Sequence, residues 1–598
     1  MSSADKGSSR VEHERRVLRE AAGRGRIATF GAWLKLSGPG WLQSAITIGG
    51  GSLSNSLYLG VLVGFAFLWV QPVAMILGVA MLAAISYVAL STGERPLKAI
   101  NEHVSPVLGW SWVLASIAAN MVWSMPQYAL AAGALQQNLF PGFFGPGFGG
   151  TLGAALIVMA VAIGNVMLYN HGGAGVKIFE TIIKLLIGSI VLCFVGVVFK
   201  LFLGGAVTWP AVGAGLIPDF SLLFEPSDRL AALIERVDPA VRAFWSEFTV
   251  AKQRDTMTGA AATAVGINMT FLLPYSMLRK GWNHEFRHLA VFDLATGLVI
   301  PFALATGCIV IASASQFHGE TERGLVEGVD VERYVESPAY QRLAGRYWTL
   351  LDRRIQWEAG ESATAGLQAA RAELVDLTRA RERGEAGAAA VGSALDRVNG
   401  LYAGRLERAD RVYAATIVDR DSFNLAEALA PLLGEGPSKV IFGFGIVAMA
   451  LNAATMLMLI NGLCLCELLG RPARGKTQLA GSLMPALAVL VLLRWRGAMM
   501  WLAVPTSVFC ATLLPIAYLA FLLLINQRRL MGDRMPTDPA RAIWNVLMAA
   551  AVLASGALSV FNLNGKLGAP WGYIIFAVFG LLILVVGRPH LKRARDAE

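Results

Sequence analysis

The chain has 598 residues, of which 55% are hydrophobic and only 15% are charged. Soluble proteins carry about 25% charged residues, so this composition excludes an ordinary soluble protein and indicates a chain surrounded largely by lipid. The formal net charge of +10 is not gathered in a compact basic domain. We therefore relate it to membrane topology and anionic lipid, and expect no nucleic-acid partner.

About twelve apolar stretches are long enough to cross a bilayer. They lie at 38–60, 65–91, 108–138, 150–168, 174–204, 256–279, 290–315, 438–466, 479–493, 498–526, 541–561 and 569–587. Basic residues precede the first stretch, recur in alternate short loops and end the chain. The positive-inside rule then predicts cytoplasmic termini, and we expect an integral protein of the bacterial inner membrane. The first stretch begins too late for a cleaved signal peptide.

Two polar insertions interrupt the apolar pattern, and the span count puts both outside the cytoplasm. The longer one is rich in Ala, Arg, Glu and Leu, with helical spacing at Leu367, Ala370 and Leu374, which predicts a helical hairpin capping the outer face. A partner-docking or gating element is the alternative. The predicted order is a basic N-terminal segment (1–37), spans 1–5 (38–204), an insertion (205–255), spans 6–7 (256–315), a largely helical insertion (316–437), spans 8–10 (438–526), spans 11–12 (527–587) and a basic tail (588–598).

The first and sixth spans are interrupted by glycine, proline or polar residues in corresponding places of two halves. The interrupting residues are Gly49, Gly50, Gly51 and Ser52 in the first span, and Gly266, Asn268, Thr270 and Pro274 in the sixth. If spans 1–5 and 6–10 are inverted repeats, the two breaks face each other near the membrane centre. Unwound backbone is tolerated there only where it is buried or lines a wet cavity, so we predict a central binding site. Glycines that merely ease helix packing are the alternative.

Four segments of the chain resemble the Nramp (natural resistance-associated macrophage protein) transporter family, in the right order. They are Gly38 to Leu42 (GPGWL), Ile309 to His318 (IVIASASQFH), Ala426 to Gly434 (AEALAPLLG) and Leu514 to Gly532. The resemblance covers spans 1–10 but not the two insertions. It implies an all-α polytopic membrane protein with a leucine-transporter-like 5+5 inverted repeat and two additional C-terminal helices. It also implies alternating access, and typical members co-transport a divalent transition metal with protons.

The chain departs from the family pattern at the two breaks. Where the family has Asp-Pro-Gly-Asn in the first helix, this chain has the run from Gly49 to Ser52, and only Met269 can stand for the methionine of the family's Met-Pro-His motif. No Asp, Glu or His occurs at 38–60, 108–138 or 257–278. Manganese and iron favour carboxylate, imidazole or thiolate ligands, so such a site suits them poorly. The resemblance therefore does not carry the family's proton coupling to this chain.

Neutral oxygen donors remain at the breaks, and they suit a partly hydrated hard cation such as magnesium. Besides backbone carbonyls, the amide of Asn452 is a further candidate donor. We predict a secondary transporter of a small solute, with a divalent cation as the first choice and no cofactor. An amino acid or small carboxylate, held by free amides at the first break, is the alternative. The predicted substrate-binding residues are Gly49, Gly50, Gly51, Ser52, Asn268, Met269 and Thr270.

Two motifs look enzymatic. His284 to His288 (HEFRH) matches the HExxH pattern of zinc proteases, but the nearest acid, Asp293, is too close to serve as third ligand on the same helix. A membrane metalloprotease is therefore a minor alternative. The stretch 470–477 matches a phosphate-binding loop without the strand that such a loop needs, so we expect no ATP. We predict that the protein is not an enzyme.

Charged residues inside the spans are candidates for gating or coupling. Glu180 and Lys184 share one face of the fifth span, where charges usually pair inside the bundle. We expect them to pair at an inner gate, and a coupling role for Glu180 is the alternative. Asp293, near the cytoplasmic end of its span, receives the same interpretation. The sequence leaves the oligomeric state open.

Overall fold

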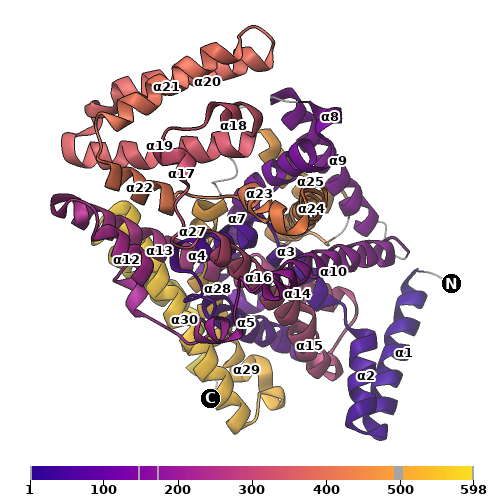
Figure 1. Ribbon diagram of the computed structural model, residues 1–598. Helices are drawn as coiled ribbons and strands as arrows, with labels where there is room; N and C mark the ends of the chain where they lie inside the picture. Colours follow the sequence, from indigo (N-terminus) through magenta and orange to yellow (C-terminus); the bar gives the residue numbers. More distant parts are fainter. Residues whose placement is uncertain (1–2, 146–147, 171–173, 474, 491–502, 596–598) are drawn as a thin grey trace.

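The computed structural model describes residues 3–145, 148–170, 174–473, 475–490 and 503–595, and over these residues the chain is helical without a strand (Figure 1). Nine of the described helical stretches are long and apolar enough to cross a membrane, and a bent pair of helices adds a tenth. Trp571–Val586 is a shorter apolar helix. The spans expected at 479–493 and 498–526 lie partly outside the described residues. The predicted all-α membrane class is confirmed.

The N-terminal half begins with two helices that precede the first span. The first span is broken into α3 and α4, whose axes differ by 56°. The helices of this half are α1 (Ser3–Arg24), α2 (Arg26–Leu36), α3 (Pro39–Thr47), α4 (Gly50–Val63), α5 (Val70–Thr92), α6 (Pro96–His103), α7 (Pro106–Ala134), α8 (Pro141–Phe144), α9 (Phe148–Asn170) and α10 (Ala174–Leu203).

The sixth span is also interrupted. The sixth is built from α13 and α14, and α13 begins at Arg242, earlier than the expected start at residue 256. Its added turns pack on the long insertion, because Trp245 donates to Asp410 (2.5 Å) and Thr249 bonds Tyr413 (2.6 Å). These contacts stabilise a polar stretch of helix that hydropathy alone does not reveal. The helices are α11 (Trp209–Ala214), α12 (Asp228–Ile234), α13 (Arg242–Ala264), α14 (Met269–Arg279), α15 (Arg287–Leu294) and α16 (Ile300–Phe317).

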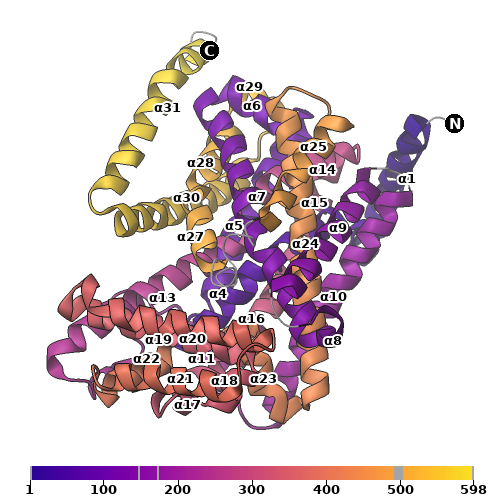
Figure 2. The same cartoon turned by 90° about the horizontal axis from the view of Figure 1, so that it is seen from above.

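The long insertion is helical, and α20 and α21 form a hairpin at its far edge (Figure 1). Leu367, Ala370 and Leu374, which share the predicted helical face, are all buried. Figure 2 shows this insertion at the opposite end of the molecule from both chain termini. We call these two ends the insertion end and the terminal end. The helices are α17 (Arg323–Val326), α18 (Val331–Glu336), α19 (Pro338–Ala359), α20 (Ala365–Glu382), α21 (Ala388–Ala403), α22 (Arg408–Ile417) and α23 (Ser422–Leu433).

The C-terminal part completes the bundle. Helix α24 runs beside α7 through the centre, and α30 and α31 lie together on one side (Figure 2). Most of α31 that can be described is exposed, as expected for a helix that faces lipid. The helices are α24 (Glu435–Leu468), α25 (Lys476–Leu483), α27 (Ala503–Ala511), α28 (Leu514–Ile525), α29 (Arg528–Met531), α30 (Asp538–Leu567) and α31 (Trp571–Arg595).

Candidate functional site

The break in the first span falls at Ile48 and Gly49. Ile48 leaves the helical conformation (φ −86°, ψ 78°), and Gly49 is extended (φ −133°, ψ −174°). Gly50, Gly51 and Ser52 then form the first turn of α4, so the break begins one residue earlier than the predicted run from Gly49 to Ser52. The Ser52 hydroxyl donates to the Thr47 carbonyl across the break. The break is therefore a fixed turn rather than a loose loop.

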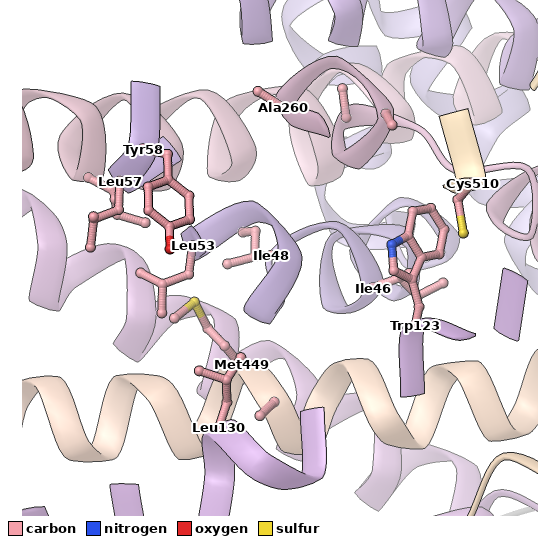
Figure 3. Packing of buried hydrophobic residues seen from close by; sticks show 14 of the residues in the cluster. Ile46, Ile48, Leu53, Leu57, Tyr58, Trp123, Leu130, Ala260, Met449 and Cys510 are labelled. Carbon is pink, nitrogen blue, oxygen red and sulfur yellow. The ribbon is translucent and has the colours of Figure 1, made fainter. Parts of the chain in front are cut away.

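The glycines of this break are required by close neighbours. A Cβ on Gly49 would lie 3.0 Å from the Ala453 methyl group of α24 and 3.2 Å from the Ile46 carbonyl oxygen. A Cβ on Gly50 would overlap the Leu130 side chain of α7 and lie 3.0 Å from Gln127 Oε1. Figure 3 shows Ile46 and Ile48 beside the break, with Trp123 and Leu130 nearby. Glycine thus lets α7 and α24 approach the broken helix closely.

The break in the sixth span lies between α13 and α14, over residues 265–268. Asn268 caps α14 by accepting from the Met269 amide (2.9 Å), and its Nδ2 donates to Asn120 of α7 (2.9 Å). The Thr270 hydroxyl donates to the Ile267 carbonyl and accepts from Trp112 Nε1 (2.9 Å). Asn268 and Thr270 therefore brace the break, and neither side chain lines the cavity described next.

A small cavity of about 30 Å³ lies between the two breaks. Some of its lining residues were predicted from the sequence, and others were not. Of the predicted set, Gly49, Gly51, Ser52 and Met269 line the cavity, whereas Gly50, Asn268 and Thr270 do not. The complete lining is Ile46, Thr47, Gly49, Gly51, Ser52, Trp123, Gln127, Thr263, Gly266, Met269, Ala453 and Leu457.

Three polar lining residues were missed, namely Thr47, Gln127 and Thr263. Gln127 follows Asn120 and Ser124 within the apolar third span, and this run of polar residues was the available signal. Its Oε1 accepts from the Gly50 amide (3.1 Å), and its Nε2 donates to the Trp123 carbonyl (3.2 Å). Thr47 donates to Met269 Sδ (3.3 Å), which links the first break to the sixth. The two breaks therefore face each other, joined by direct contacts.

The cavity chemistry is polar and uncharged. Its lining includes three residues with hydroxyls (Thr47, Ser52 and Thr263), the amide residue Gln127 and the thioether residue Met269, and among its described lining residues none is Asp, Glu, His or Cys. One water molecule needs roughly 10–15 Å³ of such a cavity. The cavity therefore has room for about two waters or one small ion. Oxygen donors in this number and arrangement suit a hard cation.

Buried amides next to the cavity have spare hydrogen-bonding capacity. Asn452, predicted as a possible ligand, does not line the cavity but adjoins Ala453, which does. Its amide, and that of Gln43 one turn before Thr47 on α3, are buried and have no hydrogen-bond partner among the described residues. Buried polar groups are rarely left unpaired, so water or an ion is expected beside them.

The predicted gate residues gather around the start of α3. Asp293 is fully buried, and its carboxylate accepts from the amides of Gly38 (2.9 Å) and Gly40 (2.6 Å) and from the Ser37 hydroxyl. A carboxylate suits the N-terminus of a helix, where free amides and the helix dipole favour negative charge. Lys184 Nζ lies 3.4 Å from the Ser37 carbonyl oxygen.

Glu180 does not contact Lys184 in the expected manner but pairs with Lys280, which follows α14 (3.1 Å). Glu180 and Lys184 on α10 therefore each reach across to the broken spans. These contacts tie the terminal end of α3 and of α14 to their neighbours.

The HExxH stretch does not have the geometry of a zinc site. His284 lies in a 3₁₀ turn before α15, so His284 and His288 do not share one α-helix. Glu285 is paired with Arg15 (3.4 Å) and Arg19 (2.9 Å) of α1 rather than free to act as a base. The one described cluster with metal-ligand spacing, Glu94 with Glu102 and His103, lies elsewhere, on and just before α6.

Comparisons with known proteins agree with the broken-helix arrangement. The family model for natural resistance-associated macrophage protein-like (Nramp) sequences matches residues 40–350 and 408–563, most of the chain. The unmatched stretch between them contains the α20–α21 hairpin. No curated protein matches the chain.

Solved structures of an Eremococcus coleocola manganese transporter match nearly the whole chain. A point mutant and a complex with an aromatic bis-isothiourea substituted compound each have a TM-score of 0.59, 14% identity, and coverage of 95% of this chain and 96% of that chain. Another mutant has a TM-score of 0.55 and 15% identity at the same coverage. At this identity the likeness establishes the fold. Because the family model covers most of the chain, the predicted family and the prediction of a transporter rather than an enzyme are confirmed, and the chain belongs to the Nramp family.

Proposed function

We propose that this Nramp-family protein moves a hard divalent cation, with magnesium as the preferred ion, by alternating access. The observation that carries this proposal is the cavity between the two helix breaks, which offers neutral oxygen donors without a described acidic lining residue. Magnesium binds oxygen ligands, and a cavity of about 30 Å³ leaves room for the ion with about one of its waters. A neutral site that holds a partly hydrated ion fits that behaviour better than it fits manganese or iron, which favour anionic or nitrogen ligands.

The size of the cavity favours an ion over an amino acid. About 30 Å³ accommodates one small ion or about two waters, whereas an amino acid needs several times that volume. The Gly50 amide, which a carboxylate would need at the start of α4, is already bonded to Gln127. The amino-acid alternative therefore requires both a larger cavity and the release of that hydrogen bond.

The Met269 thioether is the one soft donor on the cavity wall. Its sulfur accepts from the Gly266 amide (3.3 Å) and lies 3.3 Å from the Thr47 hydroxyl, whose one hydrogen is shared with the Gln43 carbonyl (3.0 Å). A sulfur with neighbours on both sides offers less to an incoming metal than the oxygens do, so the oxygen donors dominate the chemistry. This supports a hard ion rather than a soft one.

We also propose that the terminal end faces the cytoplasm of a bacterial cell and that the insertion end lies outside. The basic N-terminal segment and tail support this orientation through the positive-inside rule. The contacts of Glu180, Lys184 and Asp293 then close the cytoplasmic side of the cavity. The cation enters from the insertion end and leaves where those contacts open.

The test is uptake by purified protein in proteoliposomes, with magnesium and manganese compared in parallel against protein-free vesicles. We expect saturable magnesium uptake, with manganese transported less efficiently. A pH gradient imposed in either direction should change the rate little, since no described lining residue titrates near neutral pH. Absence of cation uptake by folded protein would overturn the proposal, and uptake of amino acids instead would establish the alternative.

A further inference from the structure

We infer that Gln127 determines the charge of the substrate site and thereby its preference among divalent cations. This inference rests on the proposed function and adds a specificity-determining residue to it. Gln127 lies on α7, outside both broken spans, yet its side chain reaches the cavity between them. It is 3% exposed, so its amide is held in a protein environment rather than in solvent.

The orientation of the amide is fixed at both atoms. Nε2 donates to the Trp123 carbonyl one turn back on α7 (3.2 Å), and Oε1 accepts from the Gly50 amide (3.1 Å). Because the Gly50 amide can only donate, the atom facing the break is the oxygen. An amide oxygen has two lone pairs, so one remains for a cation after the Gly50 bond is made.

The Gln127 oxygen lies close to the glycines of the first break. A Cβ on Gly50 would lie 3.0 Å from Gln127 Oε1, and a Cβ on Gly49 would lie 3.8 Å from it, in ordinary van der Waals contact. The glycines of the first break bring no side chain to the cavity. The oxygen beside them comes from Gln127 of α7, which belongs to neither broken span. Gly50 and Gln127 form a complementary pair, since the glycine has no side chain and the long side chain of Gln127 accepts from its amide.

An oxygen from an amide carries only a partial charge. Electrostatic attraction to a divalent ion scales with the charge on the ligand, so a carboxylate at the same place would bind far more strongly. With an amide the ion is held weakly and keeps part of its hydration, which favours magnesium and rapid release. Gln127 thus sets the neutrality of the site, since a glutamate of the same length would bring a negative charge there and would lose the Nε2 hydrogen bond to the Trp123 carbonyl.

The deciding experiment compares wild-type protein with Gln127→Glu and Gln127→Met in the same vesicles. Gln127→Glu should lower the KM for manganese by at least about tenfold, and by more than for magnesium. It should also make uptake pH-dependent, with loss at acidic pH as the new carboxylate is protonated. Gln127→Met keeps the volume but removes the oxygen, so it should raise the KM for magnesium at least about fivefold.

Gln71→Glu is the matched control. Gln71 is also buried, but it bonds Ser56 and does not line the cavity. The same charge added there should leave the ratio of manganese to magnesium KM unchanged. Thermal stability of each variant in detergent separates a specific effect from misfolding, and manganese binding to purified Gln127→Glu supplies a readout that does not depend on transport.

The outcomes distinguish this inference from the proposed function. Wild-type magnesium uptake together with unchanged ion preference in folded Gln127→Glu would overturn the role of Gln127 alone. The same shift in Gln71→Glu would also overturn it, because the effect would then follow from charge anywhere in the bundle. Failure of wild-type protein to move any divalent cation would overturn both.

Discussion

Gly50 is where the broken first span and α7 meet most closely. Its amide donates to Gln127, and any Cβ there would overlap Leu130. We expect Gly50→Pro to abolish uptake, because proline removes the donor and forces α7 away from the break. The variant should still fold, since the helix already begins at this residue and proline is tolerated in a first turn.

Uptake in proteoliposomes and size-exclusion profiles in detergent check this expectation. Gly307→Ala is a useful control, because a Cβ there meets nothing within 4 Å. Wild-type uptake by Gly50→Pro would contradict the assignment of the site to this break.

Met269 tests whether sulfur contributes to binding. Met269→Leu keeps the volume and should cost less than about 1.5 kcal/mol of stability. Because the sulfur is engaged by Thr47 and Gly266, we expect magnesium uptake to stay within about twofold of wild type. Competition of manganese against magnesium uptake is the measurement. A loss of magnesium transport that exceeds tenfold would mean that the thioether is a principal ligand.

Among single residues, those that interrupt a pattern were visible in the sequence, and those that complete the site were not. Gly49, Gly51, Ser52 and Met269 stand out in apolar spans and line the cavity. Asn268 stands out equally but turns away to cap α14 and bond Asn120. The sequence shows that a polar residue in an apolar span needs a partner. Whether that residue binds the substrate or stabilises the break depends on which helix packs against it.

Within the insertion, one carboxylate clamps the start of α23 to α19. Asp421 Oδ1 caps the helix by accepting from the amides of Phe423 (3.0 Å) and Asn424 (3.1 Å). Its Oδ2 receives Arg342 and Arg346 of α19, each at 3.2 Å. Burial alone would raise the pKa of Asp421, but the two guanidinium groups hold the pKa below its ordinary value. The clamp therefore ties α19 to α23, the last helix of the insertion before α24.

Asp421→Asn should keep the helix cap and break the clamp. Removing one partner of a buried ion pair costs about 3 kcal/mol, so the midpoint of thermal unfolding should fall by several degrees. A carboxyl with a lowered pKa stabilises the fold above its unfolded pKa of about 3.9, and the effect is lost as pH falls through the folded value. The gap between wild type and variant should be constant from about pH 8 to pH 5 and close below about pH 4.

Asp238→Asn is the matched control for the clamp. Asp238 also caps a short helix by accepting from the Ala240 amide (2.8 Å), but no ion pair involving it is described. Its variant should change the unfolding midpoint little at any pH. A gap between wild type and Asp421→Asn that already closes near pH 6 would contradict the lowered pKa.

Helix boundaries were predictable where hydropathy changes abruptly and unpredictable where tertiary contacts extend a helix. The bend between α3 and α4 falls within one residue of the glycine run. The start of α13 was missed by about four turns, because Trp245 and Thr249 are stabilised by the distant residues Asp410 and Tyr413. A pattern read along the chain contains no information about such partners.

The arrangement of the membrane spans could be predicted from the sequence, because a membrane permits few kinds of spanning structure. Apolar length fixes the spans, and two interrupted helices in a repeated order favour one transporter architecture. The contacts at the terminal end could be predicted only in part. Glu180 and Lys184 were identified as gate residues, but the sequence favours pairs one turn apart on α10, whereas Glu180 pairs with Lys280 beyond α14. The actual contacts join helices that are separate in the chain, and we propose that alternating access moves these helices apart.

The Glu180–Lys280 pair tests whether this closure controls access to the cavity. Both side chains are 17% exposed, so the pair is largely shielded and worth about 1 kcal/mol or more. Glu180→Lys should shift the population toward a state open at the terminal end by about fivefold or more.

The measurement is the rate at which a thiol reagent, added from the terminal end, labels a cysteine that replaces Thr47 on the cavity wall. A larger open population gives faster labelling. The double variant Glu180→Lys with Lys280→Glu should restore slow labelling, whereas Lys98→Glu, which breaks an exposed pair with Glu102, should change nothing. If the double variant labels as fast as Glu180→Lys, the contact between the two charges does not hold this end closed.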